Sequence, residues 1–148
     1  MTEQDRQVAE LRSLIRSYDR CRDSLLDELV VDWKHFKASV VFRMYEPTSA
    51  GKNLTLTFNC KELRRLYWDS QWTGTVAREA VQVCRKRNMI YLYVAPSDEE
   101  DDTDNYIPDG DDNMPHVQNV DVGFYVGALS ITASCRENDA NSAAETPA

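Results

Sequence analysis

Apolar side chains recur in steps of three and four along the first thirty residues, which is the spacing of one face of a helix. The recurrence is interrupted at Arg22, and it predicts an amphipathic helix over residues 4–30. With fewer than four heptads, the stripe favours a helix packed on its own domain over a coiled-coil pairing, which stays an alternative. Its apolar positions are Val8, Leu11, Ile15, Tyr18, Leu25 and Leu29.

The pattern then changes to a period of two, which indicates strands with one buried face. Residues 37–45 and 54–59 alternate in this way, and so do residues 89–94 and the second half of residues 122–134. In the first of these strands, Lys37 and Arg43 share the side opposite the apolar residues. In residues 89–94 the alternation directs Ile90, Leu92 and Val94 inward and Met89, Tyr91 and Tyr93 outward.

Helical spacing returns between the strands. Leu63 and Leu66 suggest a helix over residues 61–68, and residues 76–84 suggest another that begins after Thr73-Gly74-Thr75. The second ends in Arg85-Lys86-Arg87, where a helix C-terminus favours cations. The whole pattern predicts an α+β fold, with about four strands in an antiparallel or mixed sheet. Helices would cover one face of the sheet, and the other face would be open.

Charge divides the chain into two parts. Sixteen of the seventeen basic residues precede Pro96, whereas residues 97–118 contain nine acidic residues and no Lys or Arg. This segment has no periodicity, so it predicts an acidic loop. The body before it is mildly basic, so the overall acidity does not exclude a polyanionic partner. We expect a single α+β domain over residues 1–136 and a disordered tail over residues 137–148.

Catalytic and cofactor motifs are missing from the pattern. The sequence has no GxSxG and no glycine-rich phosphate loop, and its four cysteines are scattered with only His35 and His116 to join them. The acidic segment lacks the glycine and terminal glutamate of an EF-hand loop. We therefore expect no enzyme activity, no metal and no cofactor. No apolar run is long enough to span a bilayer, so we expect no membrane association and a cytoplasmic location.

The open face of the predicted sheet is rich in hydroxyl side chains. Hydroxyls can bind phosphate and ribose oxygens, and Lys37 and Arg43 lie about 20 Å apart at ~3.3 Å per residue. Nucleic-acid binding is one interpretation of this face. The other is an ordinary solvated sheet surface, since Ser, Thr and Tyr are common there.

Three short segments, in the same order, resemble the RNA silencing suppressor family of tombusviruses and aureusviruses. The first is Trp33-Lys34-His35-Phe36-Lys37 with Val40-Val41-Phe42-Arg43-Met44-Tyr45, which is similar to the family's aromatic-then-VVFxxY strand. The second is Leu63-Arg64-Arg65-Leu66 leading to Ser70-Gln71-Trp72-Thr73-Gly74, similar to its helix entry. The third, Ser130-Ile131-Thr132-Ala133-Ser134, is similar to its S-I-T-x-S strand.

The resemblance implies a viral suppressor of RNA silencing that sequesters double-stranded small RNA (siRNA) on an open sheet face. Binding would be directed by backbone and shape rather than by sequence, and the protein would act as a homodimer in the host cytoplasm. An alternative is a protein-interaction module that docks a basic partner through its acidic loop and pairs through its N-terminal helix. The candidate RNA-binding residues are Lys37, Arg43, Arg64, Arg78, Arg85, Ser130, Thr132 and Ser134.

Overall fold

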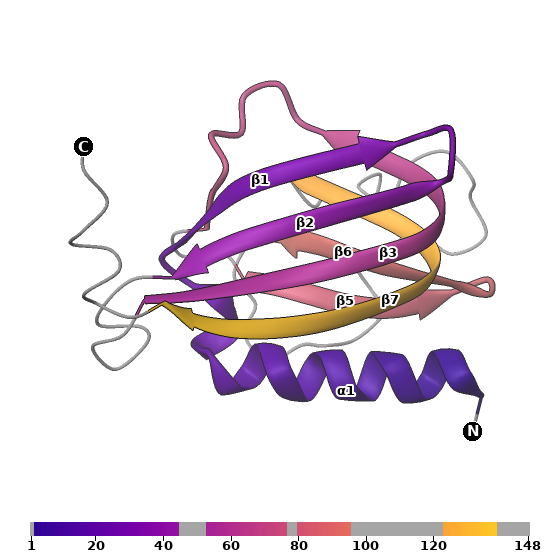
Figure 1. Ribbon diagram of the computed structural model, residues 1–148, viewed down its shortest axis with the longest axis horizontal. Helices are drawn as coiled ribbons and strands as arrows, with labels where there is room; N and C mark the ends of the chain where they lie inside the picture. The colour runs from indigo at the N-terminus through magenta and orange to yellow at the C-terminus, as the bar shows by residue number, and fades with distance from the viewer. Residues whose placement is uncertain (1, 45–52, 77–79, 96–122, 139–148) are drawn as a thin grey trace.

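The computed structural model describes residues 2–44, 53–76, 80–95 and 123–138 (Figure 1). The predicted acidic loop and all but two residues of the predicted tail lie outside these ranges. In chain order the described elements are helix α1 (Glu3–Ser17), the single 3-10 turn η1 (Asp19–Cys21), and strands β1 (Ser24–Asp32), β2 (Lys37–Met44), β3 (Asn53–Trp68), β4 (Thr75–Val76), β5 (Ala80–Lys86), β6 (Met89–Ala95) and β7 (Phe124–Asn138).

The seven described strands form one antiparallel sheet in the order β4-β1-β2-β3-β7-β6-β5. The sheet curls into a half-barrel, and α1 is the one α-helix packed against it in the described part of the chain. The predicted α+β fold, with about four strands and several helices covering one face, is therefore wrong. None of the described helices is long and apolar enough to cross a membrane.

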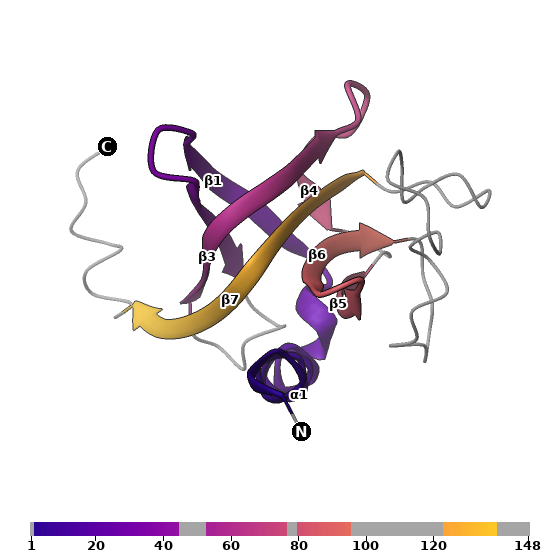
Figure 2. The same ribbon diagram turned by 90° about the vertical axis from the view of Figure 1, so that its right-hand side faces the viewer.

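Two long strands, β3 and β7, belong to both walls of the half-barrel. The first part of β3 pairs with β2 as far as Lys61, whereas residues 63–68 pair with β7 alone. A bulge between Leu63 and Arg65 and left-handed backbone at Glu62 (φ 57°) separate the two parts. Because a bulge bends its strand, the sheet turns a corner here. Figure 2 shows β1 on one side of the molecule and β5 and β6 on the other, with α1 seen end-on below them.

Helix α1 closes the opening between the two walls. β6 pairs with β7 only as far as Ala128, so the β7 backbone beyond that residue needs other partners. The Gln7 side chain accepts a hydrogen bond from the Ile131 N–H (3.0 Å), and the Gln4 amide donates to the Leu129 carbonyl (2.9 Å). Arg12 Nε donates to the Val83 carbonyl in β5 (3.0 Å). The helix thus supplies side-chain partners to strand edges that the curled sheet leaves open.

The core fills the space between the two walls and α1. Phe42 and Phe58 are fully buried and meet edge to face, with ring centroids 5.9 Å apart. Leu11 and Ile15 of α1 pack into the same cluster as Leu92 of β6. Burying each side chain of this size contributes about 1.5–3 kcal/mol, so the apolar stripe of α1 is a substantial part of the stability. The inward positions predicted for residues 37–45 and 54–59 are confirmed by this burial.

The predicted helix over residues 4–30 is confirmed only in its first half. α1 ends at Ser17, and the chain then passes through left-handed backbone at Asp19, Arg20, Cys21 and Asp23 before β1 begins. Leu25 and Leu29 belong to β1, and their four-residue separation matched a helix by coincidence. The break at Arg22 lay close to the true boundary.

The two other predicted helices are strands wherever the structure describes them, and residues 77–79 lie outside the described residues. In residues 61–68, the bulge between Leu63 and Arg65 inserts one residue, so Leu63 and Leu66 both pack on the core although they are three residues apart, as on a helix. In residues 76–84, the strand β5 is buried on both sides. Val81, Gln82, Val83 and Cys84 are all buried, which erases the period of two that marks a half-exposed strand.

The outward direction predicted for Tyr91 and Tyr93 is also only partly right. Both side chains lie on the side opposite Leu92, yet Tyr91 is 7% exposed and Tyr93 is fully buried. They form a second apolar cluster with Cys84 and Tyr125, and Tyr67 stacks on Tyr125 with ring centroids 5.4 Å apart. This half of the sheet therefore has no open polar face among the residues that the structure describes.

Candidate nucleic-acid interface

A broad polar surface lies on the side of β2, β3 and β7 that points away from the core. The inward residues of β2 and of the first part of β3 are buried, so the alternate residues point outward. Of the twelve outward positions, only Val41 is apolar. We call this surface the outer polar face, formed by Lys37, Ser39, Val41 and Arg43 of β2, Thr55, Thr57, Asn59 and Lys61 of β3, and Ser130, Thr132, Ser134 and Arg136 of β7.

Strand register sets these side chains side by side in four rows that cross the three strands. Directly opposed residues in antiparallel strands have Cβ atoms about 4.5–5.5 Å apart, so each row is continuous. The face is about 20 Å long and about 10 Å wide, from the rise per residue and the strand spacing. In order from the turn between β1 and β2, the rows are Lys37–Lys61–Ser130, Ser39–Asn59–Thr132, Val41–Thr57–Ser134 and Arg43–Thr55–Arg136.

Cations stand at both ends of the face. Among the described residues, no ion pair joins Lys37, Lys61 or Arg136 to a carboxylate. Arg43 differs, because its Nη2 atom lies 2.9 Å from the Asp27 carboxylate of β1. The Nε atom of Arg43 is buried and has no hydrogen-bond partner among the described residues. Within the described parts of the chain, three cations of the face thus have no carboxylate partner, and the fourth is partly neutralised.

A hollow of about 460 Å³ opens at the Lys37–Lys61 end of the face. It extends across four strands, from β1 to β7. Its outward lining combines one apolar side chain with two cations, one carboxylate and several neutral polar groups, and the sheet backbone at Ala38 and Cys60 forms its floor. The outward residues are Val30, Asp32, Lys37, Ser39, Asn59, Lys61 and Thr132.

The turn that joins β1 to β2 borders the hollow. Asp32 accepts a hydrogen bond from the His35 backbone N–H (3.2 Å), and its carboxylate lies 2.8 Å from the His35 Nδ1 atom. The hydrogen bond from the His35 side chain is the main reason that the pKa of Asp32 is lowered, so this carboxylate stays charged at neutral pH. Trp33 and Phe36 in the same turn are about half exposed.

The structure brings together five of the eight residues predicted from the sequence. Lys37, Arg43, Ser130, Thr132 and Ser134 all belong to the outer polar face.

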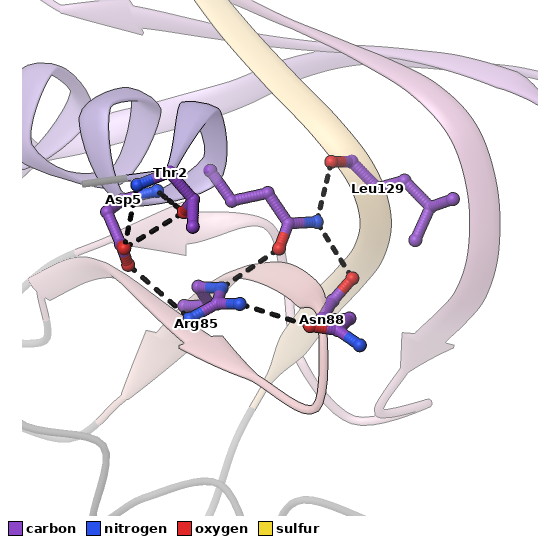
Figure 3. Close-up of polar contacts among 6 residues, drawn as sticks. Thr2, Asp5, Arg85, Asn88 and Leu129 are labelled. Atoms are coloured by element: carbon purple, nitrogen blue, oxygen red, sulfur yellow. Dashed lines mark hydrogen bonds and ion pairs between the residues drawn. The ribbon is translucent and has the colours of Figure 1, made fainter.

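Two of the other three predicted residues, Arg64 and Arg85, are not on the face. Arg64 is the unpaired residue of the bulge, and its guanidinium lies 5.9 Å from the centre of the Phe36 ring. Arg85 lies at the contact between α1 and β5, where it bonds Gln4, Asp5 and Asn88 (Figure 3). Arg78 lies outside the described residues.

The candidate RNA-binding residues chosen from the sequence did not include Lys61, Asn59 and Arg136, although all three belong to the face. Lys61 continues the alternation of residues 54–59, but the helical spacing expected from residue 61 onward hid it. Arg136 follows Ser130, Thr132 and Ser134 in steps of two, so extending that strand by two residues identifies it. No cluster of metal-ligating side chains occurs in the part of the chain that the structure describes.

Comparisons with models of known protein families, with curated proteins and with solved structures found no match. The resemblance to the silencing suppressors therefore rests on its three short motifs alone. The second motif, which resembles a helix entry, here forms the end of β3 and the turn after it. Function has to be inferred from the chemistry of the outer polar face itself.

Proposed function

We propose that this protein binds the sugar-phosphate backbone of double-stranded RNA on its outer polar face and acts by sequestration, without catalysis. The observation that carries the proposal is the position of Lys37, Lys61 and Arg136. These cations lack described ion-pair partners and stand at the two ends of a surface otherwise formed almost entirely of neutral polar groups. Cations bind phosphates, and hydroxyl and amide groups between them bind further phosphate oxygens and ribose 2′-hydroxyls.

The dimensions of the face favour backbone contact over base reading. The outer face of a curled sheet is too broad to enter the deep and narrow major groove of an A-form duplex, so base edges stay out of reach. A face about 20 Å long can span several successive phosphates of one strand. Binding without sequence preference follows from this geometry.

The three sequence motifs that resemble silencing suppressors suggest that the bound RNA is a small duplex and that the protein sequesters it. A protein that covers short RNA duplexes stoichiometrically withholds them from a silencing complex, so suppression of silencing in a host cytoplasm would follow from binding alone. A homodimer would double the length of backbone covered. Sedimentation of the complex with a duplex of about 21 base pairs, the length of small silencing RNAs, would give the number of chains per duplex.

A salt series on the same duplex tests the central claim. The logarithm of the binding constant should fall linearly with the logarithm of the salt concentration, because each phosphate contact releases counterions. Replacing Lys37, Lys61 and Arg136 together by Gln should weaken binding and reduce the slope by about 2–3, which corresponds to three lost phosphate contacts.

A matched control separates the face from the overall charge. Arg6, Arg16 and Lys86 lie on α1 and β5, and replacing these three by Gln removes the same charge elsewhere. This control should retain most of the affinity and the slope of the wild type. Absence of duplex binding at low salt, or equal losses in the two triple variants, would contradict the proposal.

A protein-interaction module remains the rival function. The structure uses the apolar stripe of α1 within the chain, since Val8, Leu11 and Ile15 are 6% exposed or less. Pairing through that stripe would therefore have to open the core, so the stripe offers the rival no free surface. The rival function also requires a basic partner to dock on the acidic loop, and that loop lies outside the described residues.

A further inference from the structure

The hollow beside Lys37 and Lys61 has the size and chemistry of a small-ligand site. Its volume of about 460 Å³ falls within the range of about 300–1,000 Å³ typical of such sites. An isolated phosphate or sulfate ion would leave most of that space empty. The side chains around it are also mixed in kind, with charged, neutral polar and apolar groups converging on one volume.

Lys37 and Lys61 are Cα partners in the register of β2 and β3. Like charges at directly opposed positions destabilise a sheet. No ion pair with a described residue relieves Lys61. Asp32 faces Lys37 from β1 and is also bonded to His35, so its charge offsets only part of the repulsion, on the Lys37 side. An anion seated between the two ammonium groups would relieve their repulsion.

The remaining lining fixes what kind of anion fits. The Asp32 carboxylate is charged and repels a phosphate, so the phosphate belongs on the Lys61 side of Lys37. Asn59 and Thr132 lie next to Lys61 and offer an amide and a hydroxyl for sugar hydroxyls or phosphate oxygens. Val30, which is 51% exposed, forms an apolar wall at the β1 end. These groups suit a phosphate joined to a larger body with both polar and apolar surface.

We infer that this hollow is a binding site for one nucleotide, with its phosphate held between Lys37 and Lys61. The nucleotide could come from a strand of duplex RNA, and in that case the inference rests on the proposed function. A free nucleoside monophosphate carries the same chemistry and is the second source. Ser39 and Thr132 form the polar rim, and Val30 contacts the base or sugar.

Titration of the full chain with adenosine 5′-monophosphate, followed by amide NMR shifts, tests the inference without RNA. The largest shifts should fall on residues 37–39, 59–61 and 132. Adenosine, which lacks the phosphate, should bind at least about tenfold more weakly. Lys61→Gln should also lose about tenfold in affinity, since one of two charged contacts to the phosphate is removed.

Lys34→Gln is the matched control, because Lys34 lies in the adjacent turn and does not line the hollow. It should bind adenosine monophosphate as the wild type does. Circular dichroism of each variant confirms that it is folded. Shifts that map to α1 and β5 instead, or equal losses in Lys34→Gln and Lys61→Gln, would overturn the inference.

A parallel titration with the RNA duplex distinguishes the two proposals. Binding of the monophosphate without binding of the duplex would support a nucleotide site in the hollow and contradict the proposed RNA function. In the opposite case, the duplex binds equally well to the wild type and to Lys61→Gln, and the monophosphate does not bind. This result would contradict a nucleotide site in the hollow but not the proposed RNA function. Failure of both ligands would contradict both.

Discussion

The Oε1 atom of Gln7 in α1 accepts a hydrogen bond from the backbone N–H of Ile131 in β7, at 3.0 Å. The residues are far apart in sequence, and the Gln7 side chain is 8% exposed. This bond replaces the strand pairing that β7 loses where β6 diverges from it. A helix side chain therefore completes the backbone hydrogen bonding of the sheet.

Replacing Gln7 by Ala should lower the free energy of unfolding by about 1–3 kcal/mol, because the Ile131 N–H would be buried without a partner. Urea unfolding followed by circular dichroism measures the change. Glu10→Ala, at an exposed position of the same helix, should change stability by less than about 0.5 kcal/mol. Equal effects of the two substitutions would show that the hydrogen bond contributes little.

The sequence predicted the half of the sheet that carries the outer polar face and failed on the other half. β2 and the first part of β3 have one buried and one solvated side, so their alternation is readable from the residues alone. β5 is buried on both sides, and β3 contains a bulge, so each lost its period of two. The curl that puts both halves around one core depends on long-range pairing, which local patterns do not contain.

The candidate site was likewise predictable only where its residues lie on strands with a clear alternation. Lys37, Arg43 and the β7 hydroxyls lie on strands with clear alternation, and the structure brings them together. Arg85 was placed at a helix end because the sequence around it resembles one. In the structure its guanidinium bonds Gln4 and Asp5 of α1, contacts that no local pattern reveals.

Replacing Asp27 by Asn should strengthen RNA binding. The carboxylate accepts a hydrogen bond from Arg43 at 2.9 Å, and an amide oxygen can still accept it without neutralising the guanidinium charge. One exposed ion pair is worth up to about 1 kcal/mol, so affinity at low salt should rise by up to about fivefold and the salt slope should steepen by about one. Gel-shift titration measures both.

Asp23→Asn is the control for this substitution. It makes the same charge change just before β1, outside the outer polar face. Its effect on RNA affinity should be smaller than that of Asp27→Asn. If the two variants gain equally, the change reflects overall charge and Arg43 has no specific contact with RNA.

Thiol reactivity should single out Cys135. It is the exposed cysteine, whereas Cys21, Cys60 and Cys84 are buried. Burial also raises the pKa of the Cys21 and Cys60 thiols, and the thiolate is the nucleophile in alkylation. Iodoacetamide at about pH 8, near the usual pKa of a free thiol, should therefore label one site rapidly in the native protein and all four cysteines in urea, as counted by mass spectrometry. Rapid native labelling of Cys21 or Cys60 would contradict the burial of these two thiols in the core.

Stability should decline on the alkaline side. Burial raises the pKa of Cys60 to about 12, against about 8.5 for an unfolded cysteine, and it also raises the pKa of Tyr125. Between these values the unfolded chain releases a proton that the folded chain keeps, so the free energy of unfolding falls as pH rises. The contribution is complete below about pH 8 and should decrease steadily from about pH 8.5 upward.

Urea unfolding between about pH 7 and pH 10 measures this dependence. Cys60→Ala should be less stable at neutral pH, because it leaves a cavity, but its stability should fall less between about pH 8.5 and pH 10. A decline that is as steep in Cys60→Ala as in the wild type would assign the pH dependence to other groups.

Lys61→Glu should stabilise the isolated protein while it weakens phosphate binding. In the register of β2 and β3, the introduced carboxylate would face Lys37 directly, and replacing a like-charged pair by an opposite-charged one should add about 0.2–1 kcal/mol to the free energy of unfolding. The gain should shrink at high salt, where exposed charges are screened. Thermal unfolding in low and high salt measures the stability, and adenosine monophosphate titration measures the binding. A variant that is less stable than the wild type at low salt would show that Lys37 and Lys61 do not repel each other, and the physical reason for an anion between them would be lost.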